Sequence, residues 1–242
     1  MIRSWSGVVG EAAMIVTFPT LMEEFSIGTS TVQWITTGYL LILAMIIPAS
    51  SYLKKRFTLK KLFVTAICLF LVGTIMAAVT PVFSLLLLGR LIQGVGTGIA
   101  LPLMFDIVLE QVPAKKLGLM MGIASLITAM APAVGPSVGG MLVSNFGWRM
   151  IFISLIPLLL LSFFLGVFSI RQVTETEKIS FQWLDYIFLA AGFACFIFAT
   201  ITASEAGWIS VQVLGLLPAS ILCFVLFCLR GKKSAQPIID IR

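Results

Sequence analysis

The chain has 242 residues, of which 60% are hydrophobic and 11% are charged, with a formal net charge of +6 and a mean hydropathy of +1.11. A soluble domain carries roughly 25% charged residues, so this composition indicates a membrane protein. There is no His, and the four Cys lie in apolar runs without the spacing of metal ligands. We therefore expect no metal, no cofactor and no catalytic residues.

Apolar segments fill most of the chain. A bilayer core requires a helix of about 20 residues, and eight segments approach or exceed that length, at 5–22, 33–53, 61–80, 82–108, 117–143, 150–170, 184–204 and 211–230. The first is the weakest, because it is short and contains Glu11 and Pro19. The predicted fold class is an all-α polytopic membrane protein with about eight transmembrane helices.

The basic residues predict the orientation. Fourteen of the sixteen Lys and Arg fall near the termini or in alternate loops, whereas Arg149 falls in an opposite loop and Arg90 within a span. This bias places both termini in the cytoplasm of a multi-pass protein of the plasma membrane, and it argues against nucleic acid as a partner. The remaining loops then lie outside. We expect three tryptophans to form an interfacial belt at the outer boundary, namely Trp34, Trp148 and Trp208.

Two charges lie inside predicted spans. Arg90 is about 12 Å from the outer end of its span and Glu11 about 15 Å from the outer end of the first. Charges at that depth need an internal partner or a wet cavity, so they indicate function. If the two spans are neighbours, a Glu11–Arg90 interaction lowers the cost of both charges. Glu11 is then either a proton-coupling or substrate-sensing carboxylate or one member of a static ion pair.

Glycine runs occur in two spans. Small residues let helices approach closely, and prolines bend a helix because they lack a backbone donor. One run follows Arg90, and the other, within 122–142, also contains two prolines. The second run predicts either a seam on which two bundles rock or tight static packing.

These residues carry a resemblance to a known family. LLLLGRLIQGVGTGIALPL resembles the buried-arginine motif R-x-x-Q-G-x-G-x-G on the fourth helix of the major facilitator superfamily, matched by Arg90, Gln93, Gly94, Gly96 and Gly98. APAVGPSVGG resembles the antiporter motif G-P-x-x-G-G of the fifth helix, matched by Gly135, Pro136, Gly139 and Gly140.

Other segments resemble the fourteen-span drug:proton antiporters, close to the lincomycin-resistance and multidrug exporters. GEAAMIVTFPTLMEEF is similar to their first-helix motif, with Glu11 at the position of an Asp or Glu. FGWRMIF is similar to the W-R-x-x-F junction before helix six, and PIIDIR at 237–242 to a segment that follows two extra central helices. The family also has a cytoplasmic motif, G-x-L-a-D-R-x-G-R-R/K. Of its Gly, Asp, Arg and second Gly positions, this chain keeps only the Arg, as Arg56.

The resemblance implies a division of the chain. Residues 1–170 would form the N-terminal six-helix bundle as two inverted three-helix repeats, 171–183 a cytoplasmic connector, and 184–230 two extra central helices. Residues 231–242 would be a cytoplasmic tail that begins a missing C-terminal bundle.

The implied function is efflux of hydrophobic or cationic small molecules in exchange for protons, driven by the proton gradient. Glu11 would be the proton-linked or substrate-sensing carboxylate, Arg90 its electrostatic regulator, and 135–140 the rocking seam. Because only the first half of such a transporter is matched, we expect this chain to be inactive alone, unless it pairs with a separate C-terminal half or a second copy. The alternative is a non-transport membrane regulator or assembly partner; an enzyme is not expected.

The topology can be tested by cysteine-accessibility labelling. With eight spans and both termini in the cytoplasm, a cysteine at Ser26 should be labelled from outside and one at Thr58 only from inside. The reverse labelling, or an odd number of spans, would contradict the topology.

Overall fold

The computed structural model describes residues 13–170 and 182–233, and every regular element in these ranges is an α-helix. Seven of the helices are long and apolar enough to cross a membrane. They are α3 (Thr29–Arg56), α4 (Leu59–Val79), α5 (Phe83–Gln111), α6 (Ala114–Phe146), α7 (Arg149–Ser169), α8 (Trp183–Ala206) and α9 (Val211–Lys233). Each begins and ends within four residues of its predicted span, so the all-helical membrane fold is confirmed.

The first predicted span is interrupted. Residues 13–16 are helical, a turn follows at Thr17, and the short helix α2 (Phe18–Phe25) completes the segment. Pro19 cannot donate a hydrogen bond to the carbonyl of Ile15, which explains a break at this point. The hydroxyl of Thr17 donates to the carbonyl of Met14 at 2.6 Å. Glu11 lies outside the described residues.

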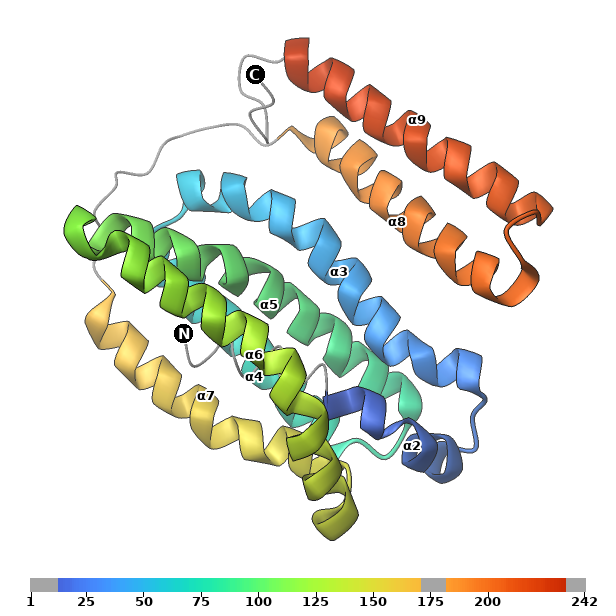
Figure 1. The fold of residues 1–242 in the computed structure, drawn as a ribbon, viewed down its shortest axis with the longest axis horizontal. Helices are drawn as coiled ribbons and strands as arrows, with labels where there is room; N and C mark the ends of the chain where they lie inside the picture. The colour runs from blue at the N-terminus through green and yellow to red at the C-terminus, as the bar shows by residue number, and fades with distance from the viewer. Residues whose placement is uncertain (1–12, 171–181, 234–242) are drawn as a thin grey trace.

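The long helices lie side by side with α5 at the centre (Figure 1). α5 packs on both α3 and α4, α7 packs on α4, and the α8–α9 hairpin reaches the bundle through α3. Trp34 of α3 meets Phe198 of α8, with 5.5 Å between ring centroids. Within the hairpin, the Arg230 guanidinium is 2.8 Å from the buried Asp185 carboxylate. The inverted repeats and the domain boundaries stay predictions.

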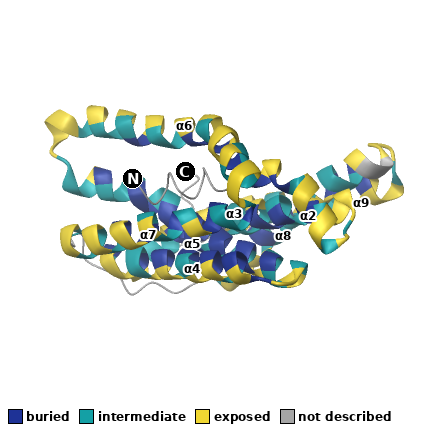
Figure 2. Ribbon diagram, turned by 90° about the horizontal axis from the view of Figure 1, so that it is seen from below, coloured by how far each residue is buried: buried dark blue, intermediate teal, exposed yellow. Residues whose placement is uncertain are grey.

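Helix α6 follows one face of the bundle and is the least covered of the seven long helices (Figure 2). Its buried residues are all small, namely Ala124, Ala131, Gly135 and Gly139. Large apolar side chains of the same helix, such as Leu119 and Met141, are exposed. α6 therefore contacts the bundle along a narrow stripe and leaves most of its surface available to lipid or to another part of a larger assembly.

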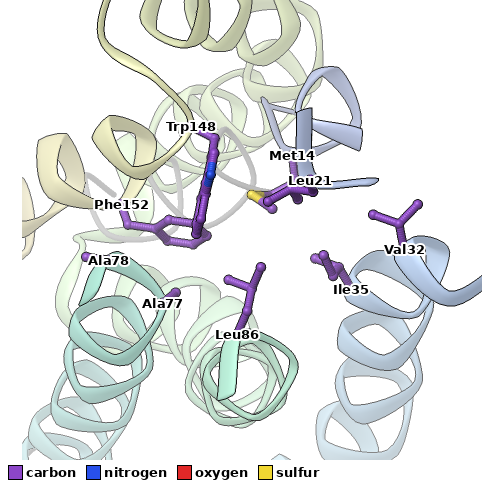
Figure 3. Packing of buried hydrophobic residues seen from close by; sticks show 9 residues of the cluster. All are labelled: Met14, Leu21, Val32, Ile35, Ala77, Ala78, Leu86, Trp148 and Phe152. Carbon is purple, nitrogen blue, oxygen red and sulfur yellow. The ribbon is translucent and has the colours of Figure 1, made fainter. Parts of the chain in front are cut away.

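A buried apolar cluster closes the end of the bundle that carries Glu24 (Figure 3). Its members come from the first helical segment, α2, α3, α4, α5 and the start of α7: Met14, Leu21, Val32, Ile35, Ala77, Ala78, Leu86, Trp148 and Phe152. The largest is Trp148, which is 2% exposed and makes edge contacts with Phe25 and Phe152 at centroid distances of 6.0 and 6.2 Å.

The prediction that Trp148 belongs to an interfacial belt is therefore wrong. Its ring can be buried because its one polar atom has a partner within the protein: the indole N–H donates to the Glu24 carboxylate at 2.6 Å. Trp34 is half-buried against α8, and Trp208 is 65% exposed.

Glu24 also joins three elements through Arg149. The Arg149 guanidinium is 2.8 Å from the Glu24 carboxylate, donates to the Thr80 carbonyl at 3.0 Å, and stacks 4.3 Å from the Trp148 ring centroid. This clamp ties α2 to the end of α4 and the start of α7. The hydrogen bond from Trp148, with the charge and hydrogen bond of Arg149, holds the pKa of Glu24 below its ordinary value, although partial desolvation opposes the shift.

Glu24→Gln should lower the thermal unfolding midpoint of the purified chain at neutral pH. Because the folded-state pKa is lowered, the stabilisation is complete above the ordinary carboxyl pKa and is lost as the pH falls through the lowered value. The difference between wild type and E24Q should therefore shrink on acidification. Glu23→Gln, an exposed neighbour on the same helix, is the control. A difference that stays constant from neutral to strongly acid pH would contradict this account.

Candidate functional site

Arg90 lies in the middle of the bundle, on α5, and is 1% exposed. Its Nη1 atom donates to the Gln93 side-chain oxygen at 2.8 Å, one turn along the same helix. The carbon of the guanidinium lies 4.4 Å from the centroid of the Tyr39 ring on α3. A desolvated cation over an aromatic face is attracted by the negative face of the ring, so α3 contributes to holding this charge.

The hydrogen-bond network continues from Arg90 to a third helix. Gln93 donates through its amide nitrogen to the Thr74 hydroxyl on α4 at 2.8 Å, and Thr74 donates to the Phe70 carbonyl at 2.7 Å. Gln93 and Thr74 are both fully buried. Buried polar networks of this kind fix side-chain orientation, because each unmade hydrogen bond would leave an unsatisfied group in an apolar interior. The network therefore connects α3, α4 and α5 around one buried charge.

The three glycines after Arg90 let neighbouring helices approach this network. A Cβ atom on Gly94 would lie 3.1 Å from the Tyr39 carbonyl oxygen, and one on Gly98 would lie 2.7 Å from Ile46, so both glycines face α3. Gly96 faces the other way, where a Cβ would lie 2.8 Å from the Ala66 carbonyl oxygen of α4. The glycines therefore bring α5 close to two helices at once.

The second glycine run packs against the first helical segment. A Cβ on Gly139 would lie 2.6 Å from the Cβ of Ala13, and one on Gly140 would lie 3.8 Å from Val16. Gly135, one turn before Gly139, is also buried. The predicted close-packing face is thus present, and its neighbour is the segment that begins two residues after Glu11.

Pro136 is exposed, as is Pro132, so both prolines lie on the side of α6 away from the buried stripe. Because Glu11 is outside the described residues, the predicted Glu11–Arg90 interaction stays a prediction. The roles assigned to both glycine motifs also stay predictions.

A charged cluster at the opposite end of the bundle was missed by the sequence reasoning. Lys54 Nζ lies 2.8 Å from Asp106 and 3.3 Å from Glu110, so it bridges the ends of α3 and α5. Arg56 matches the family motif but is exposed, whereas Lys54 makes the ion pairs between these two helices. The sequence signal for this cluster was a pair of carboxylates one helical turn apart, Asp106 and Glu110, opposite a basic loop.

The described residues hold no group of three or more His, Cys, Asp or Glu side chains suited to a metal. What the site offers instead is one buried positive charge with polar and aromatic neighbours, set among helices of membrane-spanning length. These features define a multi-pass α-helical membrane protein with an internal charge, which is the architecture of a transporter bundle.

The sequence comparison identifies the family. Residues 4–229 match the Major Facilitator Superfamily, and the chain belongs to this family of transporters, which are not enzymes. The lincomycin resistance protein LmrB of Bacillus subtilis is 35% identical over 244 residues, covering 100% of this chain and 51% of LmrB. A multidrug resistance protein B homologue of Mycobacterium tuberculosis is 28% identical, covering 92% of this chain and 42% of its own length. The chain thus spans about half the length of these relatives.

Solved structures show the same fold at low sequence identity. The POT family transporter PepTSo aligns with a TM-score of 0.59 at 13% identity, covering 93% of this chain and 51% of that structure. A D-xylose–proton symporter aligns with a TM-score of 0.55 at 15% identity, covering 94% of this chain and 65% of that structure.

Gly96→Leu tests the close approach of α4 and α5. The new side chain would meet backbone atoms of Ala66 and Phe70, which cannot rotate away. We expect a loss of stability of about 1–3 kcal/mol, as for overpacked interiors, measured as a lower unfolding midpoint in detergent. Gly118→Leu on α6, where a Cβ meets nothing within 4 Å, is the matched control. Equal unfolding midpoints for the two variants would show that a side chain at position 96 does not disturb the packing of α4 on α5.

Proposed function

We propose that this chain supplies one bundle of a proton-coupled exporter of hydrophobic or cationic drugs. Family membership gives the transporter class, and the names of its relatives, which include lincomycin resistance and multidrug resistance proteins, support drugs as the cargo. The observation that carries the proposal is the buried Arg90, held by Gln93 and by Tyr39. A positive charge at that depth in an apolar bundle is typical of an ion or substrate pathway.

The proposed coupling uses Glu11 and Arg90. The proton affinity of a buried carboxylate depends on its distance from a neighbouring cation and on its access to water. A movement of the bundle that changes this distance or this access to water changes the protonation of Glu11. The transport cycle can thereby link proton entry to drug exit. Arg90 suits the regulating role because its network holds the guanidinium between three helices, so its charge stays in place while other elements move.

The proposed moving element is the contact between α6 and the first helical segment. The buried stripe of Gly135 and Gly139 offers a smooth surface on which Ala13 can slide. The remaining surface of α6 carries exposed apolar side chains, which suit a second bundle on the far side of a transport path. Alternating access requires two such bundles that exchange contacts around a central site.

We place the protein in the plasma membrane with both termini and the Lys54 end of the bundle in the cytoplasm, on the distribution of basic residues. Its partners are the lipid bilayer, the drug, and a second bundle, either a C-terminal half or a second copy. Residues 1–242 alone would not perform coupled export, because one bundle provides one wall of the path.

Lincomycin resistance in an efflux-deficient bacterial host tests the proposal. The chain would be expressed alone and together with the second half of LmrB as the complementing bundle. Resistance that an uncoupler abolishes is expected only from the pair. In the pair, Glu11→Gln and Arg90→Gln should remove resistance at unchanged protein levels, whereas the control Glu23→Gln should keep it.

Two results would contradict the proposal. Uncoupler-sensitive resistance from the chain alone would show that a second half is not required. Full resistance from the paired E11Q variant would remove Glu11 from the coupling mechanism.

A further inference from the structure

An apolar cavity opens at the Lys54 end of the bundle, away from the Arg90 network. Its volume is about 560 Å³, within the range of sites that hold small molecules. It lies where α3 ends and α4 begins, with α5 behind, and its main lining residues are Leu53, Phe57, Lys60, Lys61, Leu62 and Ile99. Leu62 and Ile99 are buried, whereas Phe57 and both lysines are exposed, so the cavity is apolar inside and basic at its mouth.

The mouth carries an excess of positive charge. Lys60 and Lys61 line it, and two more basic residues, Lys55 and Arg56, lie in the sequence between the lining residues Leu53 and Phe57. Among the described residues, the ion pairs of this loop are those of Lys54 with Asp106 and Glu110, so the charges of the other four are not neutralised by an ion pair there. The first turn of α4 adds to this field, because the N-terminus of a helix is its positive end.

The combination selects one kind of ligand. The positive mouth disfavours a cationic drug, and the apolar interior disfavours a small soluble anion, which would gain nothing from Leu62 or Ile99. A molecule with an anionic head and a long apolar tail satisfies both parts. Basic clusters immediately beside a transmembrane helix attract anionic lipids, and the cavity lies at that position on α3 and α4.

We infer that this cavity is a binding site for an anionic phospholipid. Its phosphate would lie at Lys60 and Lys61, and one acyl chain would enter the cavity past Thr65 toward Ile99. The site is separate from the proposed drug pathway, so the inference does not depend on the proposed function.

Native mass spectrometry of the purified chain tests the headgroup contact. The chain would be mixed with equal amounts of phosphatidylglycerol and phosphatidylcholine of the same acyl chains, and the ratio of the bound lipids measured. The double variant K60Q/K61Q should lower the preference for phosphatidylglycerol by about fivefold per lysine, the effect of one basic residue beside an anionic surface. The control K115Q/K116Q removes an equal charge from the start of α6, where neither lysine lines the cavity, and should change the preference much less. Equal losses in both double variants would overturn the site.

A second pair of variants tests the acyl-chain contact. Thr65 is exposed and lines the cavity, so Thr65→Phe should fill it and weaken retention of phosphatidylglycerol. Val72→Phe, two turns further along the same face of α4 and also exposed, is the control. Unchanged retention in T65F would show that no acyl chain enters the cavity. Equal losses in T65F and V72F would show nonspecific contact with the helix surface, which also contradicts the proposal.

Discussion

The buried charge of Arg90 is the constraint on which the centre of this bundle depends. A guanidinium in an apolar interior has to be stabilised from several directions, and here the ring of Tyr39 and the amide of Gln93 supply part of that stabilisation. These contacts, with the hydrogen bond from Gln93 to Thr74, require α3 and α4 to lie close to α5. Gly94, Gly96 and Gly98 permit that proximity because they remove side chains from the contact surfaces. The buried-arginine motif is thus one physical unit, in which the glycines create the space that the charge network needs.

The two ends of the bundle are held by different chemistry. At one end, Glu24, Trp148 and Arg149 combine an ion pair, an indole hydrogen bond and a buried aromatic cluster. At the other end, Lys54 joins α3 to α5 through two carboxylates that are only partly exposed. Ion pairs in water contribute little to stability, but the Glu24 clamp is supported by the burial of Trp148, and the partly buried Lys54 pairs are screened less by solvent and salt. α5 takes part at both ends and in the middle, which explains its central position.

The sequence predicts the helices well because a membrane span has one dominant requirement, about 20 apolar residues, and each long helix meets it. It also predicts that glycine-rich faces will pack closely. Which helix each glycine meets was not predictable, since Gly94 and Gly96 face opposite neighbours and that depends on the helix arrangement. The same limit explains why the burial of Trp148 and the ion pairs of Lys54 were not predicted. Their partners lie 124 and 52 residues away in the chain, and the position of a tryptophan near a span end does not reveal whether a distant segment supplies a hydrogen-bond acceptor.

The length of α6 has a mechanical consequence. Its 33 residues extend about 50 Å, well beyond the roughly 30 Å of the hydrocarbon core, so a straight α6 would have to tilt strongly or project into the headgroups. Pro132 and Pro136 free the backbone carbonyls of residues 128 and 132 from the helical ladder, and bending there is easier than elsewhere in the helix. We therefore expect a change in bilayer thickness or in the tilt of one segment to be absorbed at these two residues. The segment before Pro132 can therefore adjust to the membrane without disturbing the contact of Gly139 with Ala13.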